Sequence, residues 1–129
     1  MPSYNVAQIE SITDTIHETM NIDNNTVINV IDIAQNLGFD VFASDFTADN
    51  VNGMVINSSS EKSIYINADD IPERQRFTIA HELGHIVLHH ISKDEDYRIV
   101  DFRSNSEKYD PREHEANNFA ASLLIPREK

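Results

Sequence analysis

The sequence contains no cysteine, and this absence narrows the kinds of site that the chain can build. Without cysteine no disulfide can staple the fold, as small secreted domains usually require, so we expect a cytoplasmic protein. Any metal site must use histidine and carboxylate ligands, a donor set that is more typical of catalytic zinc than of structural zinc.

Long apolar runs are also absent. No stretch approaches the roughly 20 apolar residues that a membrane-spanning helix needs, and the N-terminus lacks a basic region followed by an apolar one. We therefore expect no contact with a membrane. The chain also lacks internal repeats and linkers, so we expect its 129 residues to form one domain, residues 1–129, with a modest core.

Basic residues are scarce. Lysine and arginine number 10 against 22 aspartates and glutamates, which gives a formal net charge of −12. Such a surface repels a phosphate backbone, so we expect no direct binding to nucleic acid. It attracts basic proteins such as DNA-binding proteins, although solubility alone is a sufficient reason for the acidity.

Two helices are expected near the N-terminus, followed by strands. Residues 5–20 carry apolar side chains at helical spacing, and a second helix begins near Thr26 or Asn29 and ends at Gly38. Residues 39–42 form a short β-prone run. The apolar segments 53–57 and 63–67 flank a serine-rich turn and predict a β-hairpin.

Two more helices are expected downstream. A helix over residues 72–89 begins after Asp69 and Asp70, with aspartate as the cap and Pro72 in the first turn. Residues 91–110 are polar apart from a short apolar island, residues 97–100, and we expect a loop over the functional site. The last helix begins at Asp110 and Pro111, and Pro126 closes it.

Residues 81–85 read HELGH, a complete H-E-x-x-H motif, and they lie inside the expected helix of residues 72–89. Side chains four residues apart share one helix face, so His81 and His85 can bind one zinc ion. Glu82 then lies beside the metal, where it can take a proton from water. The flanking residues are apolar nearly all round, which predicts a buried helix whose polar groups need a partner or a metal. The motif therefore predicts a zinc metalloprotease.

A catalytic zinc site usually has three protein ligands, so a third one is expected. His89 continues the four-residue spacing, but it lies roughly 12 Å along the helix axis from His81, which is too far for one ion. The last helix offers three candidates: Glu113, His114 and Glu115.

Glu113 is favoured over Glu115, because it shares its face with small residues that would let the last helix approach Gly84 closely. A capping box with Asp110 would also explain a glutamate at position 113, without any metal. Asn117, one turn after Glu113, is placed to hydrogen-bond a ligating imidazole.

Two segments resemble a known family. Residues 76–89, RFTIAHELGHIVLH, resemble the active helix of the ImmA/IrrE metallopeptidases. Residues 113–126, EHEANNFAASLLIP, are similar to the second signature of that family, E-x-x-A-N-x-F-A-x-x-L-L-x-P. The two motifs cover about a quarter of the chain and occur in the order that the family shows.

The resemblance implies a compact, zincin-like α+β domain, in which a small antiparallel sheet packs against the active-site helix and a second helix carries a further ligand. It implies Glu113 as the third zinc ligand, beside His81 and His85. It also implies a regulatory role, because family members act on helix-turn-helix repressors encoded beside them. The chain itself has no helix-turn-helix segment. It ends three residues after Pro126, where many relatives continue, so it is either a minimal member or lacks a C-terminal part.

We therefore expect a zinc-dependent, site-specific metalloprotease, with Glu82 as its general base and a basic DNA-binding repressor as its substrate. Residues 64–67 are expected to pair with an extended substrate by strand addition. Three side chains are candidates for stabilising the oxyanion: Tyr97, His114 and Arg76. The alternative functions are a non-proteolytic, zinc-containing binding module that sequesters a repressor or toxin, and a metal-dependent hydrolase of small molecules. Glu82 argues against the binding module, because structural zinc does not need that residue.

Overall fold

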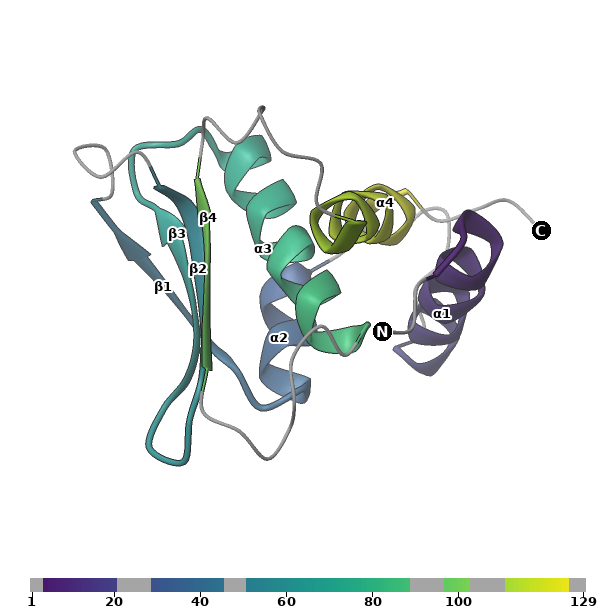
Figure 1. Cartoon of the computed structure of the whole chain (residues 1–129), viewed down its shortest axis with the longest axis horizontal. Helices are drawn as coiled ribbons and strands as arrows, with labels where there is room; N and C mark the ends of the chain where they lie inside the picture. The colour runs from purple at the N-terminus through teal and green to yellow at the C-terminus, as the bar shows by residue number, and fades with distance from the viewer. Residues whose placement is uncertain (1–3, 21–28, 46–50, 89–96, 103–110, 126–129) are drawn as a thin grey trace.

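A computed structural model describes residues 4–20, 29–45, 51–88, 97–102 and 111–125. Within these residues the chain forms four helices and one four-stranded sheet, an α+β architecture. The helices lie on one side of the sheet, with α2 and α3 next to it, α4 beyond α3, and α1 outermost (Figure 1). None of the helices in the described part of the chain is long and apolar enough to cross a membrane.

The sheet is mixed rather than antiparallel. Its strands are β1 (Asp40–Ser44), β2 (Val51–Asn57), β3 (Lys62–Asn67) and β4 (Tyr97–Phe102), in the order β1-β3-β2-β4. The expected hairpin is confirmed, because β2 and β3 pair antiparallel. The expectation of an antiparallel sheet is wrong for β1, which pairs with β3 in parallel. The hairpin turn reverses the chain between β2 and β3, and it is β3, not β2, that lies beside β1 and runs in the same direction.

The sheet corrects two further expectations. Residues 97–102 are not part of a loop, because they form β4 and pair antiparallel with β2, with Val55 opposite Ile99. The apolar island supplies this strand, since Ile99 is partly buried and packs against the core. Strand addition at residues 64–67 is wrong because β3 is an interior strand, flanked by β1 and β2. The described edges of the sheet are β1 and β4.

Both N-terminal helices begin at asparagine caps. Helix α1 (Val6–Thr19) starts with a capping box, in which Asn5 and Gln8 each accept a hydrogen bond from the backbone N–H of the other. Helix α2 (Val30–Asn36) starts at Asn29, one of the two expected positions.

Helix α2 ends as expected at Gly38, whose φ of 90° lies in the left-handed region that suits glycine. The N–H of Phe39 donates back to the carbonyl oxygen of Ala34 at 2.9 Å, which completes a Schellman end.

Helices α3 (Pro72–Val87) and α4 (Pro111–Leu124) carry the candidate site residues. The expected aspartate cap of α3 is wrong, because Ile71 occupies the cap position and makes no side-chain hydrogen bond there. Instead, Asn67 Oδ1 accepts from the N–H of Asp69, and this bond turns the chain at the end of β3. Helix α3 ends at Val87, with Leu88 as its cap, two residues before the expected end at residue 89. The expected Asp110 cap of α4 lies outside the described residues.

The core lies between the helix-facing side of the sheet and helices α3 and α4. Valine and isoleucine side chains of β2 and β3 pack there against leucine, alanine and phenylalanine side chains of the helices. Its most deeply buried large apolar members are Ile9, Val55, Ile64, Leu83, Leu88, Phe119 and Leu123. This packing buries the middle of α3, where the HELGH motif lies.

Candidate active site

His81, Glu82 and His85 lie in the middle of α3 and are buried, with 8%, 0% and 1% of their surface exposed. This confirms the buried helix that the apolar flanks predicted. The two imidazole rings lie one helical turn apart, with centroids 5.0 Å from each other and planes at 84°. Polar groups buried this deeply are costly to hold without partners, so the surrounding side chains decide what the motif can do.

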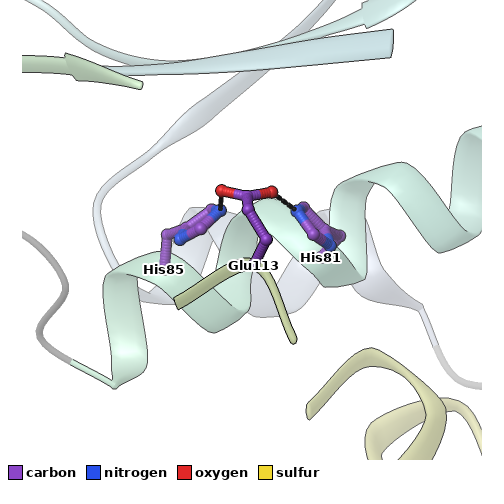
Figure 2. Close-up of side chains that lie close together, drawn as sticks. All are labelled: His81, His85 and Glu113. Carbon is purple, nitrogen blue, oxygen red and sulfur yellow. Dashed lines mark hydrogen bonds and ion pairs between the residues drawn. The ribbon is translucent and has the colours of Figure 1, made fainter. Parts of the chain in front are cut away.

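Glu113, in the first turn of α4, supplies a partner for both histidines. His81 Nε2 lies 2.9 Å from Glu113 Oε1, and His85 Nε2 lies 3.0 Å from Glu113 Oε2. Figure 2 shows the carboxylate between the two imidazoles. The structure therefore brings together, from two helices, the three residues that the sequence analysis selected as metal ligands.

The three side chains fit a metal ion in spacing and in chemistry. Their ligand atoms lie within 4.8 Å of one another. A tetrahedral zinc ion with bonds of about 2.0–2.1 Å would place its donor atoms roughly 3.3 Å apart. Two histidines with one carboxylate form a donor set found in catalytic zinc sites. Within the described residues, this is the one cluster of histidine and acidic side chains with such spacing.

The hydrogen bond between His81 and Asn117 adds a second reason to expect a cation. His81 Nδ1 lies 2.8 Å from Asn117 Oδ1, and because an amide oxygen only accepts, Nδ1 carries the hydrogen. In the neutral ring, Nε2 then presents a lone pair to a carboxylate oxygen of Glu113 at 2.9 Å. Two acceptors this close repel each other unless a proton or a metal ion lies between them. Asn117 thus makes the predicted contact, which orients the imidazole.

Glu82 lies against the sheet, where Gly53 of β2 leaves room for it. A Cβ atom at position 53 would lie 3.1 Å from Glu82 Oε2 and only 2.5 Å from Thr78 Cγ2, so the sheet approaches α3 closely because residue 53 is glycine. The strand register is irregular between Val51 and Gly53. The sequence patterns gave Gly53 no role, although a glycine inside a strand commonly marks a bulge or a close approach.

A second glycine sets the distance between α3 and α4. A Cβ atom at position 84 would lie 3.0 Å from Ala116 Cα and 3.2 Å from Phe119 Cβ. This close packing confirms the expected approach of the last helix to Gly84. Because Glu113 is carried by α4, the same packing keeps its carboxylate within reach of the histidines.

The other candidates for a third ligand lie elsewhere. Glu115 is buried, with 6% of its surface exposed, and its Oε2 accepts a hydrogen bond from the backbone N–H of Tyr4 at 2.7 Å. His114 is exposed on α4, and His89 lies outside the described residues. Glu113 is therefore the acidic residue of α4 that the structure places beside both histidines.

The candidate oxyanion stabilisers are spread over different elements. Arg76 lies half-buried on α3, and His114 lies exposed on α4. Residue 97 belongs to β4, but its side chain lies outside the described part of the structure.

A known protein family matches most of the chain. The family model described as Peptidase_M78, the IrrE N-terminal-like domain, matches residues 34–129. The matched region includes the whole sheet and both helices that carry the candidate site, whereas α1 lies before it. A comparison with curated proteins found no match.

Proposed function

The chain belongs to the family of IrrE N-terminal-like peptidase domains, and from this premise we propose that it is a zinc-dependent protease that cleaves a regulatory protein at a specific site. Membership points to a metallopeptidase of the ImmA/IrrE type. One observation carries the proposal further: His81, His85 and Glu113 converge from two helices, and Glu82 adjoins the first of them.

Zinc is the metal that this donor set favours, because imidazole and carboxylate ligands in a three-residue site are typical of catalytic zinc. His81, His85 and Glu113 would hold the ion and leave a fourth position open. When bound, zinc would polarise the scissile carbonyl and lower the pKa of water. The side chain of Glu113 is 23% exposed while that of His85 is 1% exposed, so the site opens to solvent on the side of Glu113.

Glu82 is the proposed general base. Its carboxylate lies close to Gly53, where a Cβ atom would come within 3.1 Å of Glu82 Oε2. In the proposed reaction, a carboxylate oxygen of Glu82 takes a proton from the attacking water and then passes it to the nitrogen of the leaving amine. Both transfers require the Glu82 carboxylate to keep its place near Gly53.

The substrate backbone is proposed to pair with β4. This strand is an edge of the described sheet and lies next to β2, which holds Gly53 against Glu82. An extended peptide added at a free sheet edge forms main-chain hydrogen bonds and leaves specificity to pockets for alternate side chains. Strand β4 therefore takes the role that the sequence analysis assigned to β3.

The proposed substrate is a basic DNA-binding repressor. The net charge of −12 favours encounter with a basic protein, which agrees with this substrate class. A protease of this kind would remove the repressor and so control transcription without itself contacting DNA.

The decisive experiment compares wild type with Glu82→Gln on repressors encoded beside the gene. The substitution removes the proton acceptor but keeps the shape of the side chain, so we expect zinc content and the melting temperature to stay close to wild type while cleavage is lost. Glu73→Gln, at an exposed position in the first turn of the same helix, is the matched control and should cleave normally. If the Glu82 variant inactivated the repressor at the wild-type level without cleaving it, the protein would be a binding module instead.

A further inference from the structure

Helix α4 is held from two sides. On one side, Ala116 and Phe119 pack against Gly84 of α3. On the other side lies α1, so that α4 occupies the space between α3 and α1 (Figure 1). Helix α1 precedes the region that the family model matches, which begins at residue 34. The part of the chain that supports α4 from this second side therefore lies outside the matched domain.

Three polar contacts, one buried and two part-buried, join residues 4–19 to α4. The N–H of Tyr4 donates to Glu115 Oε2 at 2.7 Å, near the start of α4. Thr13 and Ser122 share a hydrogen bond through their hydroxyl groups, and His17 Nε2 donates to the carbonyl oxygen of Leu123 at 2.8 Å, near the end of the helix. Thr13 and His17 are 0% and 5% exposed. The contacts thus fix both ends of α4. Hydrogen bonds set the position of the helix more specifically than apolar packing alone would.

Glu115 is the contact nearest to the metal cluster. It follows Glu113 by two residues and points to the opposite side of α4, where it meets the backbone of residue 4. A buried carboxylate is costly to desolvate, and a charge-assisted hydrogen bond to a backbone N–H offsets that cost only in one geometry. The first turn of a helix frays readily, and Glu113 lies in that turn.

We infer that residues 4–19 hold α4 in place and that Glu115 is a positioning residue, which keeps Glu113 within reach of His81 and His85. The inference rests on the proposed zinc site and extends it to a residue that touches neither metal nor substrate. It assigns the N-terminal segment a part in forming the site, although the segment contributes no ligand.

Zinc affinity, measured on the full chain by competition with a chelator, tests this inference without any substrate. Glu115→Leu removes the acceptor, and we expect its zinc affinity to fall by about 10–100-fold, as for other residues that orient metal ligands. Glu115→Gln keeps an acceptor oxygen and should restore affinity to near the wild-type value. The visible spectrum of the cobalt-substituted protein should change in Glu115→Leu and not in Glu115→Gln. Glu73→Leu, at an exposed position, is the control.

A second pair of variants leaves Glu115 intact and differs in the backbone N–H that residue 4 donates to it. Tyr4→Ala keeps the backbone N–H, whereas Tyr4→Pro lacks it. We expect Tyr4→Pro to bind zinc more weakly than Tyr4→Ala, and this pair decides the matter if Glu115→Leu fails to fold.

Equal zinc affinities within the Tyr4 pair, or wild-type affinity in a folded Glu115→Leu with a lowered melting temperature, would show that the contact serves stability alone. Failure of the wild-type protein to bind zinc would overturn the proposed function as well, so the two failures are distinguishable.

Discussion

The side chain at position 53 is a single hydrogen because Thr78 and Glu82 occupy the space that a methyl group would need. The proposed general base thus depends on a residue with no chemistry of its own. A zinc ligand can be replaced only by another donor, whereas Gly53 acts solely by leaving room. Its substitution should therefore separate the placement of Glu82 from the binding of metal.

We predict that Gly53→Ala lowers the cleavage rate by about 100-fold, because a shift of about 1 Å in a catalytic group costs that much. Zinc content should be unchanged, since Gly53 faces Glu82 rather than the three ligands. Peptide cleavage and metal analysis of the purified variant measure the two effects. Thr78→Ser removes the methyl group that a Cβ atom would meet at 2.5 Å, so the double variant should recover part of the rate. Wild-type cleavage by Gly53→Ala alone would refute the idea that this glycine places Glu82.

At the scale of elements, the site depends on how closely α3 and α4 pack. Alanine at position 84 has two opposing effects. It gains about 1 kcal/mol of intrinsic helix propensity over glycine. It also places a methyl group 3.0 Å from the Cα of Ala116, and a backbone atom cannot yield as a flexible side chain can. Overpacking of this kind typically costs about 1–3 kcal/mol, so the clash outweighs the gain.

We therefore predict that Gly84→Ala lowers both the melting temperature and the zinc affinity, because α4 carries Glu113 away as the helices separate. Gly38→Ala is the matched control. A Cβ at position 38 meets nothing within 4 Å, but its φ of 90° strains any side chain, so this variant should lose about 1 kcal/mol of stability. It should bind zinc normally. Thermal unfolding of the zinc-free proteins, combined with chelator competition, checks both statements; parallel losses of zinc affinity in the two variants would contradict them.

The spacing of residues within one helix was enough to predict that His81 and His85 lie together. His81 and His85 meet on one face whatever the rest of the fold does, and Gly38 ends α2 through its own backbone preference. The choice between Glu113 and Glu115 was harder, because two residues amount to more than half a turn of helix and only the neighbours of α4 show which face is inward.

The strand order could not be predicted in the same way. The insertion of β3 between β1 and β2, and the pairing of β4 with β2, depend on contacts between residues distant in sequence, which local periodicity does not encode. Strand β4 was not predicted because its apolar segment, residues 97–100, is short and lies between polar residues. The prediction of an aspartate cap was wrong because Asp69 belongs to a turn that the Asn67 side chain forms, and Ile71 is the residue before Pro72.

At the scale of the whole molecule, the net charge of −12 governs long-range encounter. Opposite charges steer association, and salt screens this attraction over a Debye length of about 10 Å at 0.1 M. We predict that association with a basic repressor slows as the salt concentration rises, while dissociation changes less. Stopped-flow or surface-based kinetics across a salt series measure both rates. Duplex DNA should not bind to this chain alone at any salt concentration in the series. An association rate that stays flat from low to physiological ionic strength would leave the acidity as a solubility feature only.

The contact between Tyr4 and Glu115 joins residues 111 positions apart, and it bears on the order in which a ribosome delivers the chain. Synthesis exposes α1 first, then the HELGH helix with both histidines, and α4 with Glu113 after them. A nascent chain therefore displays an incomplete ligand set until α4 has emerged and closed the long loop back to α1. On the proposed function, the metal site cannot assemble before α4 emerges, since Glu113 arrives together with the helix that the N-terminal segment holds in place.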